Sequence, residues 1–142
     1  MSATRSTPSK TAEPVHVAVA VIFNARQQVL LTQRHVDSHQ GGLWEFPGGK
    51  LELGESLEQA LGRELREELG IVVREHHAFL SIEHDYADKR VLLDVQCVTT
   101  FEGTPAACEG QPMRWVNVAD LPDYAFPKAN AAIVTALVQG QR

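Results

Sequence analysis

The spacing of leucines between residues 56 and 70 constrains the fold more than any other feature of the sequence. Four of them recur at every fourth residue and share one face of a helix: Leu57, Leu61, Leu65 and Leu69. Ser56 predicts the N-cap of this helix, with Gln59 three residues later as its capping-box partner, and Gly70 predicts its end. Because one face is apolar, the helix must pack against other elements of a buried core.

The segments around this helix have the patterns of β-strands. Residues 15–22 alternate β-branched with mostly small side chains at period two, which predicts a strand buried on both faces. Further strands are expected at residues 28–33, 78–86, 91–99 and 113–118, with a short extended piece at 43–46, an irregular stretch at 121–126 and a closing helix at 129–138. This order predicts an α+β fold (the α/β class in its broad sense), with a mixed β-sheet sandwiched between α-helices.

Length and composition suit a single globular domain rather than a disordered or fibrous chain. The chain has 142 residues, of which 44% are hydrophobic and 22% are charged. Residues 1–14 are rich in Ser, Thr, Lys and Pro, and we expect them to form a flexible N-terminal tail ahead of a domain at residues 15–142. The sequence shows neither a secretory signal nor an apolar run of about 18 residues, so it predicts a cytoplasmic protein without a membrane span.

The formal net charge is −5, from 18 Asp+Glu against 13 Lys+Arg. This acidic balance argues against binding to a nucleic-acid polymer or to an anionic membrane surface, since both require a basic face. Six glutamates and three basic residues lie in residues 49–71, so −3 of the −5 belongs to this one segment. A polyanionic substrate of this segment would have to arrive together with divalent cations.

Three glutamates of the predicted helix lie beside its leucine face. Glu64, Glu67 and Glu68 fall within an arc of about 100°, whereas a solvated run of charges would lie opposite the leucines. We therefore expect three crowded, half-buried carboxylates, with Arg63 pointing to their flank rather than between them. A divalent cation stabilises such a cluster, and oxygen ligands suit Mg²⁺, with Mn²⁺ as the alternative.

Glycines precede the helix at positions where the backbone is expected to approach it closely. Gly48 and Gly49 follow Pro47 and bring bare backbone beside the helix, and Gly54 permits a tight turn into Glu55. Because these residues lack a Cβ, a carbonyl or N–H group of this loop can approach a metal ion or a phosphate.

Taken together, residues 49–71 resemble the signature of the Nudix hydrolase family, G-x5-E-x7-R-E-U-x-E-E-x-G-U, in which U is a bulky aliphatic residue. Every specified position is matched, by Gly49, Glu55, Arg63, Glu64, Leu65, Glu67, Glu68, Gly70 and Ile71. The similarity to MutT-like members of this family extends from about residue 15 to residue 137, through the runs 44–50, 109–112 and 126–130. The resemblance implies the Nudix fold for this domain.

This resemblance also implies Mg²⁺-dependent hydrolysis of a nucleoside triphosphate to a monophosphate and pyrophosphate. For a MutT-like member the expected reaction converts 8-oxo-dGTP to 8-oxo-dGMP, which removes an oxidised purine from the nucleotide pool and prevents mutation. The catalytic residue that it implies is Glu64, which would deprotonate or orient the attacking water, supported by Glu55, which would orient Arg63. The metal ligands that it implies are the Gly49 carbonyl, Glu64, Glu67, Glu68 and Glu109.

The same resemblance places four residues at the substrate: Arg34, Phe46, Tyr86 and Asn130. The Asn130 amide offers both a donor and an acceptor, which matches the O6 and N7–H edge of 8-oxoguanine. A structural alternative for Asn130 is the N-cap of the last helix. The alternatives for the others are a core position for Phe46 and a solvated strand end for Arg34.

Two other functions fit the same signature. A pyrimidine Nudix pyrophosphohydrolase, which acts on CTP or dCTP, shares the run 42–46, but its recognising side chain near position 130 tends to be acidic. A non-catalytic Nudix binding module usually lacks acids of the signature, whereas Glu64, Glu67 and Glu68 are all present here. The expected partner is a small nucleoside triphosphate, bound by a monomeric protein.

Overall fold

The computed structural model describes residues 14–37 and 41–140 of the chain. Its strands are β1 (Val15–Ile22), β2 (Gln28–Gln33), β3 (Trp44–Glu45), β4 (Gly48–Lys50), β5 (Val72–Asp85), β6 (Arg90–Glu102) and β7 (Met113–Asn117). Its helices are α1 (Leu57–Leu69), α2 (Ala131–Val138) and the short 3₁₀ helices η2 (Val118–Asp123) and η3 (Lys128–Asn130). The predicted tail at residues 1–14 lies, apart from Pro14, outside the described residues.

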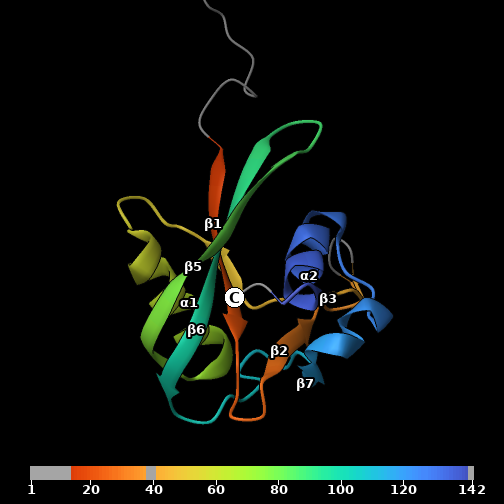
Figure 1. Cartoon of the computed structure of the whole chain (residues 1–142). Helices are drawn as coiled ribbons and strands as arrows, with labels where there is room; N and C mark the ends of the chain where they lie inside the picture. Colours follow the sequence, from red (N-terminus) through yellow and green to blue (C-terminus); the bar gives the residue numbers. More distant parts are fainter. Residues whose placement is uncertain (1–13, 38–40, 141–142) are drawn as a thin grey trace, which may run out of the picture.

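The strands form two sheets. The larger sheet has the order β4-β1-β6-β5, with β1 parallel to β6 and the other two pairs antiparallel, so it is a mixed sheet. The smaller sheet has the order β3-β2-β7 and is antiparallel. Figure 1 shows β5 and β6 as a long two-stranded ribbon beside β1.

Successive residues of β1 face the two α-helices in turn. Ala18 and Ala20 pack on the leucine face of α1, whereas Val19 and Val21 belong to the core that includes Ile133 of α2. This explains the burial of β1 on both faces, because each side of the strand meets a helix. Figure 1 shows α1 and α2 on opposite sides of β1, so the predicted mixed sheet between helices is confirmed.

The ends of α1 follow the predicted capping chemistry. The Oγ of Ser56 accepts from the Gln59 N–H at 3.1 Å, and the Gln59 side chain accepts from the Ser56 N–H at 2.9 Å. Gly70 ends the helix in the left-handed conformation with φ 71°, which glycine adopts at little cost. The predicted helix and both of its caps are confirmed.

The strand prediction differs most at β5, which begins at Val72 rather than near residue 78. Register shifts between Val73 and Glu75, and between Glu75 and His76, break the alternation of side chains there. The early half of β5 therefore lacks the period-two pattern and pairs because β6 lies beside it.

Residues 118–123 form the 3₁₀ helix η2, where an irregular stretch was predicted at 121–126. Within the described ranges, no helix has the length and apolar content needed to cross a membrane.

Candidate active site

Strand β4 brings glycine backbone against the carboxylate face of α1. Ala18 of β1 pairs with Gly49, and a Cβ on Gly49 would overlap the carboxylate of Glu64. Gly48 has φ 151°, and a Cβ there would overlap the carbonyl oxygen of Ala18. The predicted close approach of this backbone to the helix is therefore present, and side chains larger than glycine would prevent it.

Arg63 lies at the centre of an ion-pair network. Its Nε donates to Glu55 Oε2 at 2.7 Å and its Nη2 donates to Glu55 Oε1 at 2.9 Å. Its Nη1 donates to Glu64 Oε2 at 3.0 Å, and Nη2 also donates to the Lys50 carbonyl at 3.0 Å. The expectation that Arg63 points to the flank of the acids is wrong, because its Nη1 contacts both Glu64 Oε2, at 3.0 Å, and Glu67 Oε1, at 3.3 Å. The expected pairing of Glu55 with Arg63 is confirmed.

This network lowers the pKa of one glutamate strongly. Hydrogen bonds from Arg63 and from the Glu52 N–H lower the pKa of Glu55 to about 2. In turn, the Glu55 hydrogen bond is the main reason that the pKa of Arg63 is raised. The two groups are therefore both charged across the physiological range and form a fixed support beside Glu64.

The carboxylates of α1 are unequally buried. Glu64 is 17% exposed and Glu68 is half-buried, but Glu67 is 54% exposed and lies 3.3 Å from Arg63 Nη1. The expectation of three half-buried carboxylates is thus wrong for Glu67. Burial and a hydrogen bond with Glu64 raise the pKa of Glu68 to about 9, with further contributions from the charges of Glu64, Glu109 and Glu45.

The loop between β6 and β7 brings Glu109 to this end of α1. The N–H of Cys108 and the side-chain amide of Gln111 donate to the Glu68 carbonyl, at 3.1 and 3.3 Å. The Glu109 N–H donates to Gln111 Oε1 at 3.1 Å. These bonds satisfy a carbonyl at the helix C-terminus, and they place Glu109 and Glu68 in one cavity of about 190 Å³. We call this cavity the acidic hollow; its lining includes Arg34, Glu45, Glu68, Glu109 and Gln111.

The chemistry of these residues fits a hard divalent cation. Glu64, Glu68 and Glu109 supply carboxylate oxygens, and the Gly49 backbone lies against Glu64. Oxygen ligands of this kind suit Mg²⁺ or Mn²⁺, and a cation would offset both the burial and the neighbouring glutamate charges that raise the pKa of Glu68. In the part of the chain that is described, no three acidic, histidine or cysteine side chains already converge as ion ligands.

A second cavity, which we call the large pocket, contains all four predicted substrate residues. It has a volume of about 710 Å³, and its lining includes Arg34, Phe46, Tyr86 and Asn130 together with Gly49 and Lys50. Asn130 stands at the N-cap position of α2, but its side chain makes no capping hydrogen bond. Phe46 is 4% exposed and stacks on Phe126 at 5.4 Å between ring centroids, so it belongs to the core as well as to the pocket wall.

Sequence reasoning did not assign a role to Glu45, which pairs with Arg34. Arg34 Nη1 donates to Glu45 Oε1 at 2.8 Å, and the two side chains are 30% and 32% exposed. Arg34 is therefore not simply a solvated strand end. Burial raises the pKa of Glu45, and the neighbouring Arg34 charge opposes that rise. The sequence did contain a signal for this residue, because Glu45 is the one charged residue among the apolar side chains of residues 43–46.

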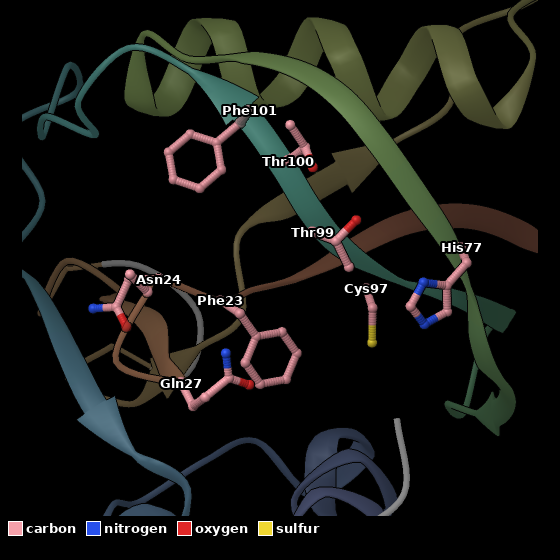
Figure 2. Close-up of a pocket in the computed structure, with 9 residues that line it drawn as sticks. Phe23, Asn24, Gln27, His77, Cys97, Thr99, Thr100 and Phe101 are labelled. Carbon is pink, nitrogen blue, oxygen red and sulfur yellow. The ribbon is translucent and has the colours of Figure 1, made fainter.

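A third cavity, of about 590 Å³, lies away from these residues (Figure 2). Figure 2 shows His77 and Cys97 on neighbouring strands, with Phe23 and Phe101 also around the space. None of the predicted site residues lines it, and no Lys, Arg, Asp or Glu is among its lining residues in the described structure. The candidate active site is therefore the large pocket, which includes Gly49 beside Glu64, and the acidic hollow, which includes Glu68.

Comparison with known proteins places this chain in a family. The family model described as NUDIX domain matches residues 18–136, and the chain belongs to that family. The chain is 37% identical over 123 residues to an 8-oxo-dGTP diphosphatase of Escherichia coli (strain K12), which covers 87% of this chain and 95% of that protein. It is also 38% identical over 120 residues to a CTP pyrophosphohydrolase of the same strain. That match covers 84% of this chain and 89% of the other protein.

Solved structures agree with this assignment. One comes from a study of MutT from Aliivibrio salmonicida and Vibrio cholerae, with 42% identity and a TM-score of 0.77 over 88% of this chain and 96% of that chain. The E. coli ORF135 protein has 35% identity and a TM-score of 0.81 over 91% of each chain.

Proposed function

We propose that this protein is a Mg²⁺-dependent pyrophosphohydrolase that converts 8-oxo-dGTP to 8-oxo-dGMP and pyrophosphate, and so removes oxidised purine nucleotides. The observation that supports this most is the pairing of two features: the full set of signature acids, and a pocket beside them that contains the Asn130 amide. The similarity to 8-oxo-dGTP diphosphatases over most of the chain supports the same substrate. We further propose that it acts on this small molecule as a monomer in the cytoplasm.

In this proposal the cation is held by the Gly49 carbonyl, Glu64, Glu67, Glu68 and Glu109. When bound, it would neutralise phosphate charge and make the attacking water more acidic. Glu64 orients the water or takes its proton as the water attacks the β-phosphorus. The bond from the β-phosphorus to the oxygen shared with the α-phosphorus breaks, so the nucleoside monophosphate leaves with that oxygen and the water oxygen becomes part of pyrophosphate.

Other residues of the network position the reacting groups. Arg63 holds the Glu64 carboxylate through its Nη1, and Glu55 fixes Arg63 with two further hydrogen bonds. A support of this kind limits the movement of Glu64, which favours a single geometry for the attack. At the other end of the substrate, Asn130 would pair with O6 and N7–H of the oxidised base. Ordinary guanine has no N7–H, so one amide group would lose its partner.

The test is steady-state kinetics on a panel of 8-oxo-dGTP, dGTP and CTP with Mg²⁺. We expect kcat/KM for 8-oxo-dGTP to exceed the values for the other two by at least about tenfold, because mismatched polar groups weaken binding. Equal or faster turnover of CTP would support the pyrimidine pyrophosphohydrolase instead. Absence of turnover on every nucleotide by folded protein would support the non-catalytic binding module.

A matched pair of variants on α1 separates catalysis from general charge effects. Glu64→Gln keeps the shape of the side chain but removes the charge, and kcat should fall by about 100-fold or more. Glu58→Gln changes an exposed acid in the first turn of the same helix and should leave kcat unchanged. Wild-type turnover in Glu64→Gln would contradict the assigned role.

A further inference from the structure

One ion pair forms the boundary between the large pocket and the acidic hollow. Arg34 and Glu45 are the two described residues that line both cavities. Their side chains meet at 2.8 Å, from Arg34 Nη1 to Glu45 Oε1, and about two thirds of each is buried. Any molecule that occupies both cavities therefore passes beside this pair.

The backbone places these two residues together but leaves the direction of the arginine side chain open. Glu45 of β3 pairs with Thr32 of β2, and Arg34 follows that strand. The Arg34 N–H donates to the Leu43 carbonyl at 2.9 Å, so the main chain of this hairpin is held. An arginine side chain has large rotamer freedom, and the bond to Glu45 removes part of it before any ligand binds.

The position of this pair suits a nucleotide that reaches from one cavity to the other. With its base in the large pocket and its phosphates at the α1 carboxylates, a nucleoside triphosphate would lie along the boundary. A guanidinium presents a rigid fork of donors that matches phosphate oxygens. An unpaired Glu45 carboxylate at the same place would instead repel the phosphates, whereas pairing with Arg34 offsets its charge.

We propose that Glu45 is a positioning residue for substrate binding, which acts through Arg34 by holding the guanidinium at this boundary, against the bound nucleotide. This inference rests on the proposed function. It assigns the specific contribution of Glu45 to binding rather than to the chemical step. Because this role belongs to binding and not to the chemical step, loss of the contact with Arg34 should raise KM and leave kcat nearly unchanged.

The test is a double-mutant cycle with 8-oxo-dGTP and Mg²⁺. Arg34→Ala, which removes the guanidinium, and Glu45→Gln, which removes the charge that holds it, should each raise KM by about tenfold, the size of effect typical of a hydrogen bond between charged groups. The double variant should have a KM no higher than that of Arg34→Ala, because Glu45 has no guanidinium to hold once Arg34 is absent and the Gln side chain no longer repels the phosphates. Glu83→Gln, an exposed acid on β5 outside both cavities, is the matched control and should retain the wild-type KM.

Three results would overturn this assignment. KM values that multiply in the double variant would mean that Glu45 contacts the substrate by itself. A loss of kcat at constant KM would place Glu45 in the chemical step, and an unchanged KM would remove it from the site. Should Glu45→Gln fail to fold, Glu45→Asp, which shortens the side chain by one methylene, serves in the same cycle. Failure of the proposed function is seen separately, as absence of 8-oxo-dGTP turnover by the wild-type protein.

Discussion

Replacing Gly49 by alanine should reduce turnover about 100-fold without unfolding the protein. The added Cβ would overlap Glu64 Cδ and Oε2 and would lie 2.6 Å from Oε1, whereas ordinary van der Waals contact begins at 3.4 Å. The carboxylate must therefore move by about 0.8 Å or more, and the 3.0 Å bond to Arg63 opposes that movement. Misplacing a reacting group by about 1 Å costs roughly 100-fold in rate.

The assay is kcat for 8-oxo-dGTP at saturating Mg²⁺, together with urea denaturation. Gly62→Ala is the matched control, because Gly62 lies on α1 and a Cβ there meets no atom within 4 Å. This control should keep the wild-type kcat and gain up to about 1 kcal/mol of unfolding free energy from helix propensity. A Gly49→Ala enzyme with kcat within about threefold of wild type would refute the argument that the backbone at this position must contact Glu64.

Asn130→Ala should lower the kcat/KM ratio of 8-oxo-dGTP to dGTP by at least about tenfold while activity on dGTP survives, and an unchanged ratio would remove Asn130 from base recognition. Ser56→Ala should lower the free energy of unfolding by about 1 kcal/mol in urea titrations, because the capping box is lost. Glu55→Gln tests the ion-pair network, since the pKa of Glu55 is about 2 in the folded protein against 4.5 without the network. The stability that Glu55 contributes is complete above pH 4.5 and is lost as the pH falls toward 2, so the urea midpoints of variant and wild type should converge over that range. A difference that is as large at pH 2 as at pH 5 would contradict this explanation.

The helix α1 and its chemistry could be predicted from the sequence because they depend on local spacing. Leucines at every fourth residue define the buried face, and the positions of Glu64 and Glu68 relative to that face follow from helix geometry alone. The caps at Ser56 and Gly70 act within a few residues of the chain, so they too could be predicted. The alternation in β1 likewise predicted its burial between two layers.

Contacts between distant segments were not available from the sequence. The direction of Arg63 depends on Glu55 in the preceding loop and on Lys50 at the end of β4, which helix geometry does not place. The early half of β5 is held by its pairing with β6 across register shifts, so its own residue pattern does not identify it. The exposure of Glu67 also depends on what packs beside α1.

The sequence by itself therefore determined a capped amphipathic helix with acids beside its apolar face, together with the family signature that contains them. Only the tertiary structure decided which groups meet these acids: the Gly49 backbone from β4, Glu109 from the loop before β7, and the Arg34–Glu45 pair between the two cavities. The physical reason is that periodicity and capping act over one or two helical turns, whereas sheet pairing and loop closure join residues many positions apart.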